Sequence, residues 1–418
     1  MKPRILIICP SFPPNPGIGG RRWAKFAKTL FKQGCDVWVF SFKLPNRNEN
    51  SHWTKDVEEL LKNNRIIEVD RNYPAVLDEY PKSFIDKLKY KFWDNFLKFR
   101  YKGNTYDRSL RWGVKLTVEI EKKINNHPIK IIATGAPFRY LSELICLNKY
   151  SNVSLIADFR DPWVNNEIAY NKGLSKKKLE QEKKNEQKVI SEFNKIFCVD
   201  QFHIEYFKST YNLNEEKFIL IPNGFDPEEA VIKRSLNSSV DRIRIVFAGT
   251  LYADAQYIVQ EFASFLEFIK ANDFNKYSIF ELVFYGNISD DYKDILAKHE
   301  IIQIRKEIAL HKVQYEIANA DFIMVFLTNQ LNYTFNTKVL ESINQGKKVL
   351  VFSSPGYLEN FVVEHNIGYS MTPLNMSNSF NQIIKDKTGS NYLIGKMPIE
   401  LMKFDINHIT KRIIKSIK

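Results

Sequence analysis

The sequence has few cysteines and no long apolar run, and these two absences limit its class. Its four cysteines are scattered, without the spacing of a metal site or a redox pair. Each lies in or beside an apolar run, so we expect buried free thiols and a reducing, cytoplasmic environment. The run Ile5–Cys9 is too short for the core of a signal peptide, and no later apolar stretch is long enough to span a bilayer.

Acidic residues are in deficit, with 48 Asp and Glu against 61 Lys and Arg, so the formal net charge is +13. A charge of this size indicates a negatively charged partner, and nucleic acid, an anionic membrane or a phosphorylated substrate would each fit. The apolar content of 44% and the charged content of 26% are ordinary for a globular protein. The length of 418 residues is enough for two domains.

Strands and helices are predicted to alternate twice along the chain, with a polar break between the two series. This pattern predicts an α/β protein with two doubly wound domains that face a central cleft. We expect the first domain at 1–227, a linker at 228–241 and the second domain at 242–400. Because both domains bring loops at strand ends, we expect the ligand to bind between them.

A loop containing glycines follows the first predicted strand. The run Arg4–Cys9 is typical of a strand buried on both faces of a parallel sheet, and a helix is expected at about 21–33. Between them, Gly17, Gly19 and Gly20 do not have the G-x-G-x-x-G spacing of dinucleotide-binding proteins. The loop is suited either to holding a phosphate against backbone N–H groups or to a long turn with unusual φ angles.

Charged residues follow the strand predicted at 153–158. Ligands of open α/β sheets bind beyond the carboxyl ends of the strands, so Asp158, Arg160 and Asp161 could handle protons or bind anions. A structural ion pair that closes the turn is the alternative.

Residues 82–102 predict a helix that is rich in both aromatic and basic residues. The apolar residues that recur at helical spacing are Phe84, Leu88, Phe92, Phe96 and Phe99. Such a helix could lie flat on an anionic membrane, and a core helix with a solvated basic side explains the pattern equally well. Stacking on nucleic-acid bases ranks third, because nothing else in the chain resembles a nucleic-acid-binding motif.

The most informative stretch is a predicted helix that opens at Thr337, ends at Gly346 and leads into an apolar strand. Lys338 lies at its N-terminal end, and Glu341 follows three residues later on the same helical face. Free N–H groups, a cation and a carboxylate at one helix end suit a phosphate beside a sugar hydroxyl. A surface helix with a Lys–Glu pair is the alternative.

Six short motifs follow one another along nearly the whole chain. They are the Gly17/Gly19/Gly20 loop, Asp158–Trp163, Pro222–Asp226, Phe247–Thr250, Ala320-Asp321 and Lys338–Glu341. In this order they resemble glycosyltransferase family four, with region 45–125 the least similar. The resemblance implies the GT-B fold, with two Rossmann-like domains. It also implies that a final helix, 401–418, packs back on the N-terminal domain.

The resemblance also implies where the donor binds. Gly19 and Gly20 would approach the donor diphosphate through backbone amides, and Gly249 and Thr250 would do so from the second domain. The segment 306–311 would pass the nucleotide base. The implied reaction is retaining transfer of a sugar from a nucleotide sugar to an acceptor hydroxyl. It needs no essential metal and no cofactor, since the nucleotide sugar is a substrate.

Side-chain roles follow from the same resemblance, with one departure. Lys338 would take a phosphate charge, and Glu341 would accept hydrogen bonds from the ribose hydroxyls. The family carries a further Glu eight positions before the second one, where this chain has Tyr333. The neighbouring Asn332 and Thr334 are expected to contact the donor sugar instead.

Departure of a nucleoside diphosphate builds negative charge, which preorganised amides and Lys338 would stabilise. Retention in this family is usually explained by front-side attack, which needs positioning more than a strong base. Arg160 or Asp161 is expected to replace the missing carboxylate, so the predicted catalytic residues are Asp161, Arg160 and Lys338.

The expected function is therefore a glycosyltransferase of lipid-linked or cell-surface polysaccharide synthesis. We expect a UDP- or GDP-sugar donor, a lipid-linked or glycan acceptor, no nucleic-acid partner, and a position in the cytoplasm or on the inner face of the membrane through 82–102. A nucleotide-sugar hydrolase or epimerase of the same fold is one alternative. A non-catalytic subunit that binds a partner glycosyltransferase is another.

Overall fold

The computed structural model divides into two compact units. It describes residues 3–15, 18–44, 54–78, 80–166, 170–213, 215–230, 242–251, 255–327, 337–389, 393–394 and 398–418. Unit 1 comprises Met1–Pro222 together with Ile409–Lys418, and unit 2 comprises Asn223–His408. Of the predicted linker, residues 231–241 lie outside the described residues.

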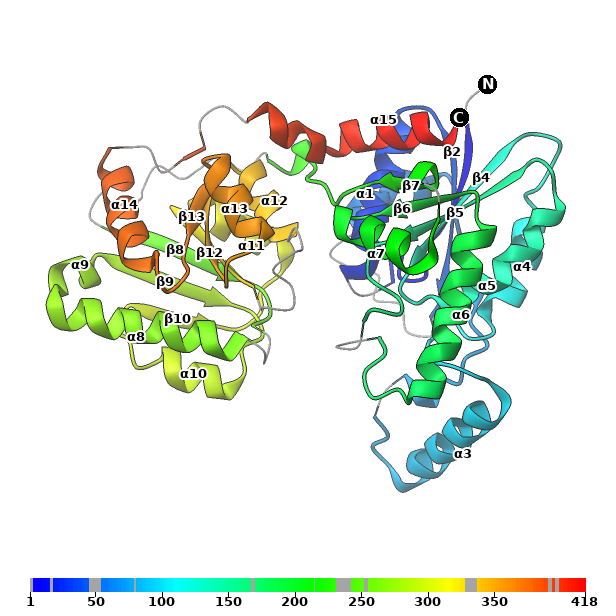
Figure 1. Cartoon of the computed structure of the whole chain (residues 1–418), viewed down its shortest axis with the longest axis horizontal. Helices are drawn as coiled ribbons and strands as arrows, with labels where there is room; N and C mark the ends of the chain where they lie inside the picture. The colour runs from blue at the N-terminus through cyan, green and yellow to red at the C-terminus, as the bar shows by residue number, and fades with distance from the viewer. Residues whose placement is uncertain are drawn as a thin grey trace. The chain divides into compact units, whose positions relative to one another are not determined.

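Unit 1 is built on a seven-stranded parallel sheet in the order β3-β2-β1-β4-β5-β6-β7. Figure 1 shows the strands of this sheet flanked by helices. Its strands are β1 Arg4–Ile8, β2 Asp36–Lys43, β3 Ile66–Asp70, β4 Ile129–Gly135, β5 Val153–Phe159, β6 Lys195–Cys198 and β7 Phe218–Leu220. Its helices are α1 Arg21–Lys32, α2 Glu58–Lys62, α3 Phe84–Arg100, α4 Trp112–Glu121, α5 Arg139–Leu144, α6 Lys176–Glu192 and α7 Gln201–Tyr211. The order reverses between β1 and β4, which is the switch point of a doubly wound sheet.

Unit 2 is built on a six-stranded parallel sheet in the order β10-β9-β8-β11-β12-β13. Its strands are β8 Ile243–Ala248, β9 Phe280–Tyr285, β10 Ile302–Arg305, β11 Phe322–Phe326, β12 Lys348–Phe352 and β13 Gly368–Ser370. Its helices are α8 Gln256–Asn272, α9 Phe274–Ser278, α10 Asp290–Leu296, α11 Leu310–Asn319, α12 Thr337–Asn344, α13 Tyr357–Glu364 and α14 Met376–Thr388.

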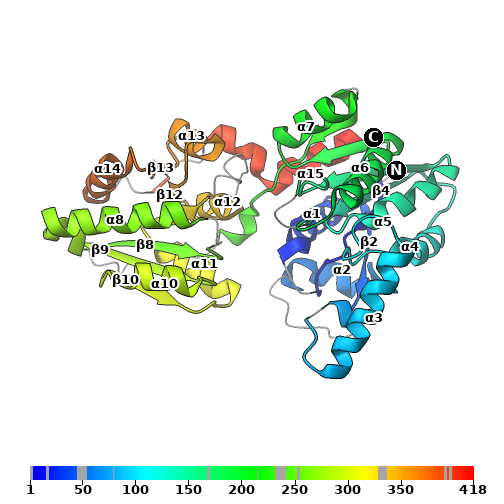
Figure 2. The ribbon, with the colours of Figure 1, turned by 60° about the horizontal axis from the view of Figure 1, so that its bottom comes forward.

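Both faces of the unit 2 sheet are covered, and the strand sequences explain this. Along β8, Ile245 and Phe247 pack into one hydrophobic cluster, while Val246 between them packs into a second cluster on the other face. A strand that must be apolar on both faces reads as a continuous apolar run rather than an alternating one. Figure 2 shows helices on both sides of this sheet, α8 on one and α11 on the other.

The last helix, α15 Ile406–Ile417, begins in unit 2 and ends in unit 1. In unit 1 the Gln33 amide donates to Thr410 Oγ1 at 2.9 Å, and Arg412 Nη1 donates to the Leu220 carbonyl at 3.1 Å. The helix predicted to start at residue 401 starts later, because Ile399–Phe404 forms a separate 3-10 segment. In the part of the chain that the structure describes, no helix is long and apolar enough to cross a membrane.

The four cysteines are free thiols, as predicted, and Cys9, Cys35 and Cys198 are buried. The prediction of burial is wrong for Cys146, which is exposed. Cys146 lies in a 3-10 segment after α5, where the neighbouring Leu147 takes the inward position.

Candidate nucleotide site

Three neighbouring strands of unit 2 end at the same edge of the sheet. In the parallel register, Ala248 at the end of β8 pairs with Tyr285 at the end of β9, and Tyr285 pairs with Arg305 at the end of β10. Gly249 follows β8, and its N–H donates to the Tyr285 carbonyl at 2.8 Å. The loops beyond these strands are therefore held together at the carboxyl edge, where open α/β sheets bind ligands.

Two glycines make the tight packing at this edge possible. Gly249 has φ +154° and Gly286 has φ +125°, conformations that side chains with a Cβ rarely adopt. A Cβ on Gly286 would lie 2.1 Å from the Gly249 carbonyl oxygen. The Gly249 N–H is already used within the sheet. This differs from the expectation of a free Gly249 amide for the diphosphate, and the exposed Thr250 follows directly.

The Lys338 ammonium occupies the space that a side chain at position 249 would fill. A Cβ on Gly249 would lie 1.7 Å from Lys338 Nζ, and this nitrogen is 5.2 Å from the centroid of the Phe247 ring. Burial lowers the pKa of Lys338, and the negative charge of Glu341 partly offsets this. A cation held away from bulk water interacts more strongly with an arriving anion than an exposed one does.

The local sequence explains why α12 presents Lys338 and Glu341 together. Val339, Leu340 and Ile343 are buried in the core of unit 2, so the helix rests on this face. Lys338 and Glu341 lie on the adjoining half-buried face. The helix ends at Asn344, two residues before the predicted Gly346. Gly346 has φ +69°, and its N–H donates to the Ile343 carbonyl at 2.8 Å.

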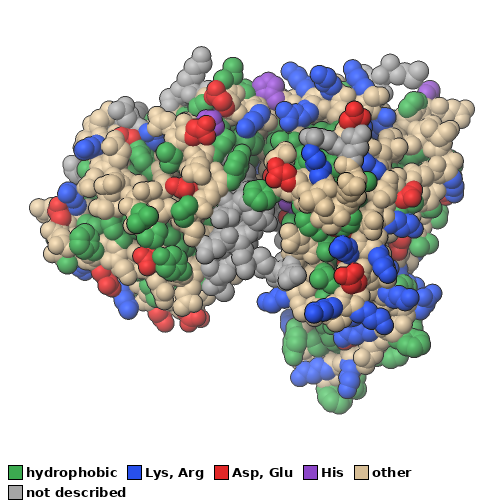
Figure 3. All heavy atoms as spheres, in the orientation of Figure 1, with side chains coloured by type: hydrophobic (Ala, Val, Ile, Leu, Met, Phe, Trp, Pro, Cys, Tyr) green, Lys and Arg blue, Asp and Glu red, His purple; other side chains and the backbone are tan. Residues whose placement is uncertain are grey.

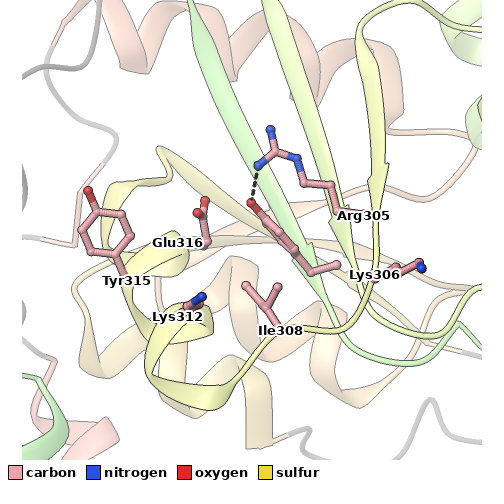
Figure 4. A pocket seen from close by; sticks show the side chains of 7 residues that line it. Arg305, Lys306, Ile308, Lys312, Tyr315 and Glu316 are labelled. Atoms are coloured by element: carbon pink, nitrogen blue, oxygen red, sulfur yellow. Dashed lines mark hydrogen bonds between the residues drawn. The ribbon is translucent and has the colours of Figure 1, made fainter.

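A pocket of about 750 Å³ opens beside these loops (Figure 4). Its lining residues are Tyr285, Arg305, Lys306, Ile308, Lys312, Tyr315 and Glu316. Arg305 Nη1 donates to the Tyr285 hydroxyl at 2.9 Å, and Glu316 is paired with Arg244 at 2.6 Å. Two tyrosines and Ile308 offer flat and apolar surface, while the exposed Lys306 and Lys312 offer positive charge.

Tyr285 connects the pocket to the Gly249 turn, against which the Lys338 ammonium packs. Its side chain lines the pocket, and its carbonyl accepts the hydrogen bond from Gly249. Two residues of the segment 306–311, Lys306 and Ile308, also line the pocket. This arrangement can hold a flat, partly apolar group in the pocket and a negatively charged group at the Lys338 ammonium.

In unit 1, Gly19, Arg160 and Asp161 come together. Arg160 Nη1 donates to the Gly19 carbonyl at 2.6 Å, and Arg160 Nε donates to Asp161 Oδ2 at 2.9 Å. A Cβ on Gly20 would lie 2.1 Å from the Ser11 carbonyl oxygen, so the loop needs glycine where α1 begins. The ion pair considered as the alternative at this strand end is present, and the Asp161 side chain is 42% exposed.

Asp158 has a structural role. It is fully buried, and its carboxylate accepts hydrogen bonds from Arg22 Nη2 at 2.9 Å, Trp23 Nε1 at 2.7 Å and Thr134 Oγ1 at 2.8 Å. These bonds tie β5 to α1 and to β4. Each of these three hydrogen bonds joins β5 to another secondary-structure element, so Asp158 stabilises the packing around the sheet of unit 1.

The predicted site residues thus fall into two groups and a remainder. Unit 1 holds Gly19, Gly20, Arg160 and Asp161, and unit 2 holds Gly249, Thr250, Lys338 and Glu341. Asn332, Thr334 and Tyr333 lie outside the described residues. Sequence reasoning did not identify Tyr285, Arg305 or Tyr315. The rule that ligands bind at strand ends could have indicated the first two.

No protein-family model matches the sequence, and no curated protein matches it. Solved structures do match. A glycosyltransferase from Rickettsia africae aligns with a TM-score of 0.59 at 15% identity, covering 100% of this chain and 98% of its own. HepE from Anabaena, solved in complex with UDP-glucose, aligns with a TM-score of 0.61 at 13% identity, covering 99% and 98%. A UDP-N-acetylglucosamine 2-epimerase from Listeria monocytogenes, described as putative, aligns with a TM-score of 0.57 at 11% identity, covering 100% and 96%.

The chain has the GT-B fold. Because the alignments cover nearly the whole of both chains, both units match these structures, and the similarity is not limited to a single domain. Identities this low establish the fold alone, because one fold supports many activities. The chemistry of this GT-B chain must therefore be argued from its own residues.

Proposed function

We propose that the protein is a retaining glycosyltransferase that moves a sugar from a nucleotide-sugar donor to an acceptor hydroxyl. The observation that carries the proposal is the Lys338 ammonium, seated against Gly249 at the end of β8 and beside the pocket that Tyr285 lines. The pocket volume of about 750 Å³ lies within the range of small-ligand sites. A cation next to a pocket of this size suits a nucleoside diphosphate.

In this proposal unit 2 binds the donor. The diphosphate lies at the turn of Gly249 and Thr250 against Lys338, and the ribose hydroxyls donate to Glu341. The base occupies the neighbouring pocket, with a UDP- or GDP-sugar as the donor. Asn332 and Thr334 contact the transferred sugar. HepE was solved with UDP-glucose, which supports this class of donor.

The chemistry requires stabilisation of the leaving group. As the bond to the sugar breaks, negative charge grows on the phosphate oxygens, and the preorganised Lys338 ammonium stabilises it. Retention follows from attack on the same face that the diphosphate leaves, so positioning of the acceptor matters more than a strong base. We propose Gly19 and Gly20 as further contacts of the donor diphosphate, and Arg160 and Asp161 as catalytic residues together with Lys338. The reaction as proposed uses no metal and no cofactor.

We place the reaction in the synthesis of a lipid-linked or cell-surface polysaccharide, in the cytoplasm or on the inner face of the membrane. The net charge of +13 supports an anionic acceptor environment as well as an anionic donor.

A nucleotide-sugar epimerase or hydrolase is the second candidate, favoured by the Listeria neighbour of the same fold. The two functions are separated by incubation of the protein with the donor alone. An epimer or a free sugar formed without acceptor identifies the second candidate. The third candidate is a non-catalytic subunit, which the Tyr333 in place of the family's Glu would fit. A protein that binds no nucleotide at all would favour this candidate.

The test is a thermal-shift screen with UDP, GDP, ADP, CMP and TDP, each with magnesium and with EDTA. A ligand at one hundred times its Kd stabilises the native protein by about 2.7 kcal/mol, which such a screen detects. We expect one nucleotide to stabilise the protein equally with and without magnesium. Lys338→Ala should reduce this shift by about half or more. Lys293→Ala, which removes an exposed cation from α10 of the same unit, should leave it unchanged. Absence of a shift with every nucleotide would contradict the proposal.

A further inference from the structure

The helix α3 of unit 1 has one face against the protein and one face without cover. Ser83 begins it, with its hydroxyl accepting from the Asp86 N–H at 3.0 Å. On the inward face, Leu97 is fully buried in a small cluster with Tyr73 and Leu110. This contact fixes the rotation of the helix, and hence the side chains that point outward.

The outward face is apolar along the whole length of α3. Its side chains are between 40% and 92% exposed, and they are Phe84, Ile85, Leu88, Phe92, Phe96 and Phe99. At about 100° per residue these six positions fall within an arc of roughly 120°, and Leu97 lies on the opposite side of the helix. A surface helix normally turns such a stripe toward the core, and here the stripe faces away from it.

Cations border the apolar arc on both sides. One border carries Lys87 and Lys91, and the other carries Lys89 and Arg100, all of them exposed. Lys98 also lies on the first border, where its ammonium donates to Asp94 Oδ2 at 2.6 Å. The two acidic residues of α3 lie on the inward half of the helix. Figure 3 shows the green apolar and blue basic side chains gathered at the end of unit 1 where α3 lies.

We infer that α3 docks the protein on an anionic membrane surface. The apolar arc enters the boundary between headgroups and acyl chains, and the helix axis lies parallel to the surface. The bordering lysines extend along the apolar surface and place their ammonium groups among the lipid phosphates. Of the two explanations that the sequence left equal for residues 82–102, the exposure of the aromatic side chains favours the membrane.

The charges argue against a second copy of this chain as the occupant. Two α3 helices packed through their apolar arcs would bring basic borders together on both sides, and like charges at an interface are unfavourable. An anionic lipid surface neutralises both borders at once. This inference is independent of the proposed glycosyl transfer, because α3 belongs to unit 1 and the nucleotide pocket to unit 2.

The full chain should be tested by co-sedimentation with vesicles of phosphatidylcholine alone and of phosphatidylcholine mixed with phosphatidylglycerol. We expect binding to the mixed vesicles, weaker binding to neutral ones, and loss of binding at high salt. The charge variant is Lys87→Gln with Lys89→Gln and Lys91→Gln, which should weaken binding about fivefold per lysine. The apolar variant is Phe92→Ser with Phe96→Ser and Phe99→Ser, which should reduce binding at least as much.

The helix α6 supplies a matched control in the same unit. Lys183→Gln with Lys184→Gln and Lys188→Gln removes three exposed cations from a helix whose apolar residues Val189 and Ile190 are buried. This variant has the same net charge as the α3 charge variant and should bind vesicles like the wild type. Near-native melting temperatures confirm that each variant is folded.

Any of the following outcomes would overturn the inference. One is wild-type binding to neutral vesicles that is as strong as to anionic ones, or a lack of binding to both. Another is an equal loss in the α6 control, which would indicate net charge rather than a docking surface. The last is a wild-type dimer in sedimentation velocity that the apolar variant converts to a monomer, while neither the wild type nor the variant binds vesicles. A second copy would then be the occupant.

Discussion

Replacement of Gly249 by alanine should weaken nucleotide binding by displacing Lys338, although alanine adds only a methyl group. The new Cβ would lie 1.7 Å from Lys338 Nζ and 2.6 Å from its Cε, far inside van der Waals contact. The end of a lysine side chain is flexible, so it moves aside and loses its position over the Phe247 ring. The ammonium is then no longer held where the phosphate is expected.

The magnitude follows from the interaction that is lost. A hydrogen bond to a charged group contributes about 1.5–3 kcal/mol, so Lys338→Ala should raise the Kd of the nucleoside diphosphate roughly 10- to 150-fold. Gly249→Ala should approach this loss without exceeding it. In the double variant the methyl group has free space and no ammonium to displace, so its Kd should equal that of Lys338→Ala.

Gly249→Ala also strains the backbone, and this cost must be separated from binding. A side chain at φ +154° costs about 1–3 kcal/mol, which lowers the melting temperature of a unit of this size by several degrees. Gly346→Ala is the matched control, since φ is +69° there and the nearest atom to its Cβ is the Ile394 carbonyl oxygen at 3.7 Å. It should lower stability and leave the Kd unchanged.

The assay is isothermal titration calorimetry at fixed salt with the nucleotide found in the screen, together with urea unfolding of each variant. The reasoning is refuted if the two losses of affinity add in the double variant, because Gly249 would then act without Lys338. It is also refuted if Gly346→Ala weakens binding as much as Gly249→Ala does.

Two further predictions concern the stability of unit 1. Asp158→Ala leaves the buried Arg22 guanidinium without its carboxylate and should cost about 3–5 kcal/mol in thermal or urea unfolding; a loss below about 1 kcal/mol would contradict this role. Burial raises the pKa of Glu186 to about 7 from its ordinary 4.5, while the Val164 N–H and Tyr211 hydroxyl donate to the carboxylate. The folded chain keeps this proton between about pH 4.5 and 7 and the unfolded chain does not, so stability should fall as the pH rises through this range. Glu186→Gln should flatten that part of the curve in urea unfolding, and an unchanged slope would assign it to other groups.

Much of the fold could be predicted because its strands are buried on both faces. Strands with a nearly continuous apolar run, such as Arg4–Ile8 and Phe322–Phe326, are unfavourable with either face exposed to water. Their burial on both faces of a parallel sheet therefore follows from their composition. The end of α12 is predictable to within two residues, because glycine tolerates positive φ and the helix stops at Asn344, just before Gly346. The Cys146 thiol was mispredicted, because a neighbouring leucine took the inward position and sequence alone does not rank such neighbours.

The candidate site was only partly predictable, because it depends on contacts between distant residues. The sequence predicts Gly249 as an amide donor to the diphosphate, but its N–H donates to the Tyr285 carbonyl. Gly249 matters instead because it has no Cβ, which leaves space for the Lys338 ammonium. The pocket joins the ends of β9 and β10 to α11, which no local pattern records. The sequence also does not determine whether the aromatic stripe of α3 faces the core or the solvent. The burial of Leu97 on the opposite side of the helix shows that the stripe faces outward.

The division of unit 1 into two segments has a consequence for biosynthesis. Residues 409–418 leave the ribosome only after the whole of residues 223–408, so the first 222 residues wait for their final helical segment while unit 2 is being made. Domains generally fold as units in the order of synthesis, and here the domain begun first is completed last. A premature stop after residue 408 would leave unit 2 entire and expose the surface of unit 1 where Gln33 and Leu220 meet α15.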